Sequence, residues 1–196
     1  TARIISVEIA SKIQGIGVDL DVFRIKEDSA AISKIYDFAY FGRFLEHKGV
    51  LEIIEASKIL QNKGFVVRIA FYGYVDENPT SFTLDQLLEW QSDGLIEYCG
   101  FTDDVVSAMN ECKVLLLPSY REALPRTCQE AAAMAIPSIV SDVPGCREVV
   151  IDNVTGLFVQ VKNAKDLATK MEKYLTNPEL ALNHGNAASK RAREIY

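Results

Sequence analysis

Short apolar runs alternate with helical patterns along most of this chain, and this alternation restricts its possible folds more than any other feature. The runs are rich in β-branched and aromatic side chains, as buried strands are. They cover residues 38–41, 66–72, 95–98, 114–117, 138–140 and 156–159. Strands that alternate with helices pair in parallel, with helices on both faces of the sheet. The sequence therefore predicts an α/β fold with a doubly wound parallel sheet.

Helical periodicity fills the segments between these runs. It predicts helices over residues 48–62, 82–92, about 105–109, 126–134 and 167–175, and a terminal helix that begins at Pro178. Gly64 ends the first of them, and Pro137 follows the fourth. A sheet of this kind binds its ligands at the carboxyl ends of its strands.

Length and charge set broad limits on function. A chain of 196 residues suits one domain, and its net charge of −6 argues against a nucleic-acid partner. No segment has the apolar length of a membrane span, and no secretory signal is visible, so we expect a cytoplasmic protein. The four cysteines, Cys99, Cys112, Cys128 and Cys146, have no Cys-x-x-Cys spacing, which predicts free thiols rather than a zinc site.

Residues 1–35 differ from the rest. They contain one predicted strand, over residues 3–7, and too little else for a domain. We therefore expect a connector over 1–35 and a single domain over 36–196. The Asp19-Leu20-Asp21 sequence imitates a metal-binding Asp-x-Asp motif, but its place in the connector favours a structural role. Gly15 and Gly17 lack the third glycine of a dinucleotide-binding loop.

The stretch from Pro118 to Glu130 carries the clearest chemical signal. A buried strand ends at Pro118, a polar loop follows, and a helix begins near Pro125. The N–H groups of a helix start attract anions such as phosphate. Glu122 and Glu130 flank this start, and carboxylates accept hydrogen bonds from hydroxyls. The pattern suits a ligand with hydroxyls on both sides of a phosphate, such as a nucleotide sugar.

Two cations follow the first predicted strand. Gly42 permits a tight exit from that strand, and Arg43 and Lys48 come directly after it. Because the carboxyl ends of parallel strands share one edge of the sheet, we expect both cations in the same crevice. Two fixed cations would neutralise a diphosphate leaving group without a metal ion.

Taken together, these motifs resemble the family-four retaining glycosyltransferases of GT-B fold. The resemblance rests first on the spacing of Glu122 and Glu130 and on residues 131–137, which follow them. It rests also on the pairs Gly42-Arg43 and Lys48-Gly49. Further matches are the segment 142–150 with Thr155-Gly156-Leu157, and Gly17-Val18-Asp19 with Phe23. The resemblance runs from about residue 12 to the end. The Tyr120-Arg121-Glu122 variant is similar to bacterial members that build capsule, O-antigen or lipid-linked oligosaccharides from UDP-activated hexoses or N-acetylhexosamines.

The resemblance implies a Rossmann-like donor domain, one half of a GT-B fold, whose acceptor domain at the N-terminal side is absent from this chain. It implies the following roles: Arg43 and Lys48, next to Gly42, bind the diphosphate; Glu130 binds the ribose; Glu122 binds the donor sugar; Phe101 lies near the base; and Leu124, Pro125, Arg126 and Thr127 offer backbone groups. Glu122, Arg43 and Lys48 are the catalytic candidates. The reaction it implies is a metal-independent, retaining transfer to a glycan or lipid-linked acceptor, by a parent protein peripheral to the inner membrane face.

The sequence departs from the family pattern at Ala123 and at Ala135-Ile136, where the family favours glycine. We expect the methyl group of Ala123 to crowd a loop that needs open backbone angles. Tyr72 and Tyr74 are expected to be core and loop residues rather than a platform for the base. Two alternatives stay open: a nucleotide-sugar epimerase of the same fold, and a non-catalytic nucleotide-binding module. A phosphorylase is disfavoured because no pyridoxal-phosphate lysine motif is visible.

Overall fold

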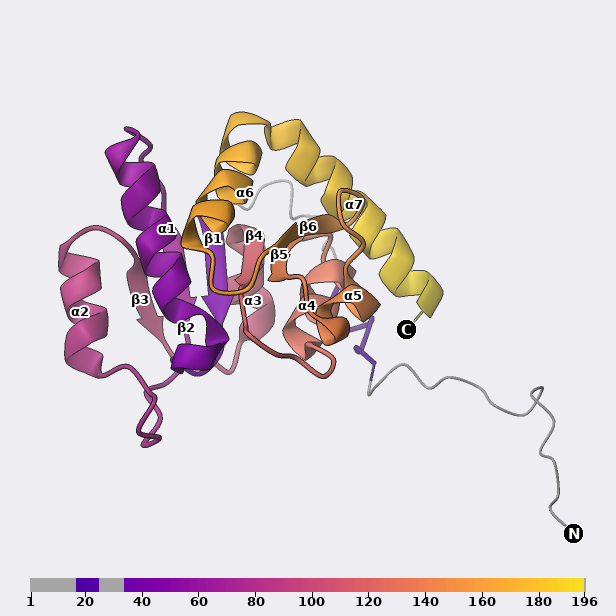
Figure 1. Cartoon of the computed structure of the whole chain (residues 1–196). Coiled ribbons are helices and arrows are strands. Elements are labelled where there is room, and N and C mark those ends of the chain that lie inside the picture. The colour runs from indigo at the N-terminus through magenta and orange to yellow at the C-terminus, as the bar shows by residue number, and fades with distance from the viewer. Residues whose placement is uncertain (1–16, 25–33, 196) are drawn as a thin grey trace, which may run out of the picture.

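The predicted parallel sheet is present in the computed structural model, which describes residues 17–24 and 34–195 (Figure 1). Six parallel strands lie in the order β3-β2-β1-β4-β5-β6. Their bounds are β1 Tyr36–Phe41, β2 Ile69–Tyr72, β3 Glu97–Gly100, β4 Cys112–Leu117, β5 Ser138–Ser141 and β6 Gly156–Val159. The α/β, Rossmann-like, doubly wound fold is therefore confirmed.

Seven α-helices connect or follow the strands within the described residues. They are α1 Val50–Asn62, α2 Leu84–Ser92, α3 Val105–Asn110, α4 Arg126–Ala133, α5 Pro144–Val149, α6 Ala164–Thr176 and α7 Pro178–Ile195, with a 3-10 turn η3 at Glu46–Lys48. The short α5 was not predicted, since six residues that include Pro144 and Gly145 give little helical periodicity. None of the described helices is long and apolar enough to cross a membrane.

The two largest apolar cores lie on opposite faces of the sheet. On one face, α1, α2 and α6 contribute Ile53, Leu87 and Met171 to a cluster that includes Phe38 of β1. On the other face, α3, α4, α5 and α7 pack on side chains such as Leu115 of β4. Figure 1 shows α1 and α6 side by side and α7 running along the other side of the domain. Because both faces are covered, the strands read as continuous apolar runs rather than alternating ones.

Two strands begin later than predicted. β2 starts at Ile69, and Val66 is 93% exposed in the irregular segment that precedes it. β3 starts at Glu97, although the apolar run begins at Leu95. Leu95 and Ile96 are buried in the first core while still in the connection from α2, so apolar burial here extends beyond the strand pairing.

The strand order reverses between β1 and β4. The chain leaves β1 towards β2 and β3 on one side, and it reaches β4, β5 and β6 on the other. The connections after β1 and β4 therefore diverge, which leaves a crevice at the carboxyl ends of these two strands. This switch point is where the predicted site residues are found.

Part of the predicted connector over 1–35 lies outside the described residues, including the strand expected at 3–7. Its described segment 17–24 contains a turn in which the carboxylate of Asp19 accepts hydrogen bonds from the backbone N–H groups of Asp21 and Val22. Phe23 is buried in the second core. The Asp19 carboxylate thus has the structural role of a turn cap.

Candidate functional site

A cavity of about 330 Å³ opens at the carboxyl ends of β1 and β4. Eight of the ten predicted site residues line it, namely Gly42, Arg43, Lys48, Glu122, Leu124, Pro125, Arg126 and Thr127. Tyr40, Phe41, Tyr74 and Leu117 complete the lining. The structure thus brings the three catalytic candidates, Arg43, Lys48 and Glu122, into one hollow. A second cavity, of about 260 Å³, lies by the amino ends of β1 and β4 and contains none of the predicted residues.

Close backbone contact holds the two main loops of the site together. Gly49 has a φ of +76°, and a Cβ on it would lie 2.2 Å from the carbonyl oxygen of Pro118. The N–H of Tyr120 donates to the carbonyl of His47 at 2.8 Å. Only glycine fits at position 49, both for its backbone angle and for its contact. The loop after β1 therefore fixes the position of the loop after β4, which carries Glu122.

Three glycines align the ends of β1, β2 and β3. The N–H of Gly42 donates to the carbonyl of Tyr72, and the N–H of Gly73 donates to the carbonyl of Gly100, both at 2.9 Å. A Cβ on Gly73 would lie 1.9 Å from the carbonyl oxygen of Gly42, so these backbones touch. Each glycine is followed by a larger residue, namely Arg43, Tyr74 and Phe101. One cation and two aromatic rings thus start from neighbouring positions along this edge.

Each of the two predicted diphosphate-binding cations is paired with a carboxylate. Lys48 Nζ lies 2.8 Å from Glu122 Oε1, with both side chains mostly buried. Arg43 Nη1 lies 3.0 Å from Asp76 Oδ2, in the loop between β2 and α2. Glu122 lines the cavity, whereas Asp76 is not among its lining residues. Asp76 could not be selected from the sequence, because it belongs to no motif that we identified.

The first turn of α4 faces the cavity through Arg126 and Thr127. Pro125 precedes the helix and provides no side-chain cap, so the first N–H groups of α4 are available to an anion. Glu130 lies one turn further along, and Arg126 Nε contacts its Oε1 at 3.0 Å. Burial raises the pKa of the Glu130 carboxyl, and Arg126 opposes this shift.

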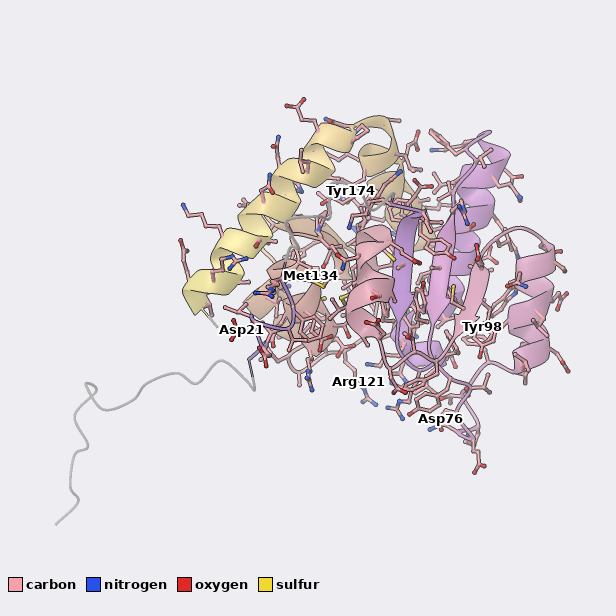
Figure 2. The ribbon with its side chains drawn as sticks, turned by 180° about the vertical axis from the view of Figure 1, so that it is seen from behind. Asp21, Asp76, Tyr98, Arg121, Met134 and Tyr174 are labelled. Atoms are coloured by element: carbon pink, nitrogen blue, oxygen red, sulfur yellow. The ribbon has the colours of Figure 1, made fainter. Side chains whose placement is uncertain are left out.

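Positive charge gathers beside this helix start. Burial lowers the pKa of His47, and the neighbouring cations Lys48, Arg121 and Arg43 lower it further. His47 is therefore neutral at pH 7, in the 3-10 turn between Arg43 and Lys48. Figure 2 shows Arg121 and Asp76 at the lower end of the sheet, whereas Tyr174 lies towards its upper end.

Two exposed aromatic rings stand at the outer end of the site. Phe101 is 64% exposed and follows β3. Its ring contacts that of Tyr74 edge to face, with centroids 6.2 Å apart. Tyr74 is 49% exposed and lines the cavity, although the sequence favoured a plain loop role for it. Tyr72, by contrast, is buried in the sheet as expected.

The two alanines that depart from the family pattern behave differently. Ala135 has a φ of +55°, in the left-handed region, which accounts for a glycine preference at this point. Ala123 has no positive φ, so its methyl group does not strain the loop. The loop is instead crowded at Gly145 of α5, where a Cβ would lie 2.1 Å from the carbonyl oxygen of Glu122.

The four cysteines are free thiols, as predicted, and three of them are buried. Burial raises the pKa of Cys128 well above its ordinary value and that of Cys146 to about 12. Thiols in this state are protonated at pH 7 and are poor nucleophiles. They contribute to packing around α4 and α5 rather than to the chemistry of the cavity.

Comparison with known proteins agrees with this arrangement. Residues 21–191 match the family described as glycosyl transferases group 1. The chain is 36% identical over 150 residues to the N,N'-diacetylbacillosaminyl-diphospho-undecaprenol alpha-1,3-N-acetylgalactosaminyltransferase of Campylobacter jejuni, covering 76% of the chain and 38% of that protein. It is 28% identical over 157 residues to the capsular polysaccharide biosynthesis glycosyltransferase CapM of Staphylococcus aureus, covering 80% of the chain and 41% of that protein. The chain thus spans about two fifths of the length of these relatives.

Solved structures share the fold at lower identity. Anabaena HepE in complex with UDP-glucose superposes with a TM-score of 0.77 at 18% identity, over 92% of this chain and 52% of that one. The C-terminal domain of the Francisella tularensis group 1 protein LpcC superposes with a TM-score of 0.77 at 21% identity, over 91% of this chain and 97% of that one. The sheet order, the crevice at its switch point and the family match over residues 21–191 lead to one conclusion: this chain belongs to the glycosyl transferases group 1 family and has the Rossmann-like fold of a GT-B domain.

Proposed function

We propose that residues 36–196 form the donor-binding domain of a glycosyltransferase and that the cavity at the switch point holds a nucleotide sugar, with UDP as the nucleotide. The observation that carries this proposal is the convergence of Arg43, Lys48, Glu122 and the uncapped start of α4 on one hollow. A diphosphate needs donors and positive charge, and a sugar needs acceptors for its hydroxyls. Both are available within this cavity.

The diphosphate lies between the two cations and α4 in this proposal. Arg43 presents a planar guanidinium and Lys48 a compact ammonium, while the N–H groups around Arg126 and Thr127 add neutral donors. These groups stabilise the charge that develops on the diphosphate as it leaves. The protein supplies this positive charge itself, so the proposed transfer proceeds without a metal ion.

The two glutamates bind the hydroxyl groups on either side of the diphosphate. Glu122, in the loop after β4, accepts from the donor sugar. Glu130, buried on α4 and held by Arg126, accepts from the ribose. Loading the site then requires Glu122 to exchange the ammonium of Lys48 for a sugar hydroxyl, which leaves Lys48 free to pair with phosphate.

The base lies towards Phe101, whose ring and that of Tyr74 form an exposed apolar surface. Stacking on an aromatic face is tolerant of base identity, so the rings do not by themselves select uracil. UDP is proposed because HepE, of the same fold, is described in complexes with UDP and with UDP-glucose.

The acceptor is proposed from the relatives. The Campylobacter relative is named for transfer of N-acetylgalactosamine to a diphospho-undecaprenol-linked sugar, and CapM for capsule synthesis. We therefore propose a hexose or N-acetylhexosamine donor, a glycan or lipid-linked acceptor, and transfer with retention at the anomeric carbon. In a retaining reaction of this type the acceptor attacks the face from which the nucleotide departs, and the leaving diphosphate takes the acceptor's proton.

Calorimetric titration tests the donor site directly. The chain should bind UDP more tightly than uridine, and UDP more tightly than ADP or GDP. Arg43→Ala should weaken the binding of UDP by about ten- to a hundredfold, because hydrogen bonds to charged groups contribute that much. The affinity for uridine should stay unchanged. Glu130→Ala should weaken both ligands. Absence of binding to UDP, ADP and GDP would overturn the proposed donor site and favour a non-catalytic interaction module that kept the fold. Conversion of a UDP-sugar without an acceptor would favour an epimerase.

A further inference from the structure

The loop between β2 and α2 supplies Asp76, the ion-pair partner of the Arg43 guanidinium. Arg43 Nη1 and Asp76 Oδ2 are 3.0 Å apart, with the side chain of Arg43 46% exposed and that of Asp76 22% exposed. The two residues are 33 positions apart in the chain. Figure 2 shows Asp76 at the lower end of the sheet, the end at which Arg121 also lies. Arg43 lines the cavity and Asp76 does not, so Asp76 contacts the guanidinium from outside the proposed ligand site.

Asp76 is itself fixed by its own loop. Its Oδ1 accepts from the backbone N–H of Asn78 at 3.0 Å, and its own N–H donates to Ser81 Oγ at 3.1 Å. Asn78 in turn accepts from the N–H and the hydroxyl of Thr80. One carboxylate oxygen therefore holds the loop while the other holds Arg43. The Asn78 contact and Arg43 also lower the pKa of the Asp76 carboxyl, so it carries its charge at pH 7.

The loop is attached to the segment that follows Arg43. The N–H of Phe82 donates to the carbonyl of Phe44 at 2.8 Å, and the N–H of Glu46 donates to the carbonyl of Thr80 at 3.0 Å. Ser81 pairs with Leu45 as an isolated bridge. Asp76 is thus a rigid neighbour of Arg43 rather than a mobile surface acid.

The contrast with Lys48 defines what Asp76 does. Lys48 is paired with Glu122, and both side chains line the cavity, so a ligand can reach and separate them. Asp76 accepts from one guanidinium nitrogen, Nη1, and leaves the donors on Nε and Nη2 for the ligand. A side chain held this way loses less conformational freedom when it binds phosphate.

From this arrangement we infer that Asp76 is a positioning residue, which holds the guanidinium of Arg43 at the cavity and so strengthens binding of a nucleoside diphosphate. The inference rests on the proposed function, because it assumes that Arg43 binds the diphosphate. The inference predicts that removal of the Asp76 charge weakens UDP binding, whereas simple electrostatics predicts tighter binding. A negative charge near the site repels a diphosphate, so its removal by itself would tighten binding.

The test is calorimetry of the 196-residue chain with UDP and with uridine. Asp76→Ala and Asp76→Asn should each weaken the binding of UDP by about two- to fivefold, which is the contribution of a partly exposed ion pair. The affinity for uridine should stay unchanged. Glu77→Gln is the matched control, because it removes a charge from the adjacent exposed position of the same loop, and it should leave UDP binding unchanged. In an Arg43→Ala background, Asp76→Ala should have no further effect.

Tighter or unchanged UDP binding in both Asp76 variants would overturn the positioning role. So would an equal loss with uridine, or an equal loss in the Arg43→Ala background, since either result would mean that the substitution only disturbs the loop. Failure of the wild-type chain to bind UDP at all is a distinct result: it would overturn the proposed function, and the inference with it.

Discussion

Lys48 Nζ lies 2.8 Å from Glu122 Oε1, so an ion pair joins the loop after β1 to the loop after β4 in the middle of the proposed donor site. Both side chains line the cavity and both are mostly buried. The cation proposed for phosphate and the acid proposed for sugar neutralise each other in this ion pair. Ligand binding should therefore exchange the partners of both side chains.

Glu122→Gln should affect the binding of UDP and the binding of the donor sugar differently. The variant removes the counter-ion of Lys48 but retains the side-chain volume, so UDP should bind as tightly as to wild type or more tightly. A UDP-hexose should lose the additional affinity that it gains from its sugar. Calorimetry with UDP and UDP-sugars measures both effects, with Glu55→Gln on the exposed side of α1 as the control. Equal losses for UDP and UDP-sugar would place Glu122 outside the sugar subsite.

Phe101→Ala should weaken uridine and UDP by the same factor. The ring is 64% exposed and contacts Tyr74, and stacking of a base on an aromatic ring contributes about 1–3 kcal/mol when measured by alanine substitution. Tyr74→Ala should give a loss of the same kind. Val66→Ala, at a 93% exposed position before β2, serves as the control for removal of an exposed side chain. Loss of UDP binding with uridine binding intact would be incompatible with a base contact at Phe101.

Gly49→Ala should destabilise the fold through the junction of the two loops. A left-handed φ costs a residue with a Cβ about 1–2 kcal/mol, and the contact with the carbonyl of Pro118 at 2.2 Å adds the cost of overpacking. Gly64→Ala is the matched control: its φ is +86°, but no atom lies within 4 Å of the added Cβ. Urea unfolding should give a larger loss at Gly49 than at Gly64. Equal losses would show that the close approach to Pro118 is not an energetic constraint.

Glu130 should make stability fall as the pH rises. Burial raises the pKa of this carboxyl above its ordinary value of 4.5. Between the unfolded and folded pKa values the folded chain binds more protons, so the free energy of unfolding decreases with rising pH across that interval. Glu130→Gln removes this contribution, and its stability relative to wild type should increase as the pH rises above 4.5. Urea unfolding over this range measures the difference, and a difference that shrinks with rising pH would mean that the folded pKa is lowered instead.

Much of the fold could be predicted because the sheet is covered on both faces. Buried parallel strands appear in the sequence as apolar runs, and the six strands predicted within residues 36–196 are all present. Periodicity could not separate strand from buried connection at Leu95 and Ile96, since both bury apolar side chains. Periodicity also missed α5. This short helix is defined by a close backbone contact of Gly145 with the carbonyl of Glu122 and not by an apolar stripe.

The site was predictable to the extent that its chemistry is local in sequence. The helix start after β4 and the cations after β1 are short motifs at strand ends, and Gly49 accounts for their proximity. Tyr74 and Asp76 could not be selected, because their places beside Phe101 and Arg43 depend on how the ends of β2 and β3 align with β1. Such alignment is set by sheet register, which no local pattern in the loop records.

A crystal structure of this chain with bound UDP is the most direct test of the donor site. The diphosphate should lie between the side chains of Arg43 and Lys48, with its oxygens at the N–H groups of the first turn of α4, and the Lys48–Glu122 ion pair should be broken. UDP bound at the amino end of the sheet, beside Asp37 and Lys113, or a diphosphate that contacts neither Arg43 nor Lys48, would contradict the proposed site.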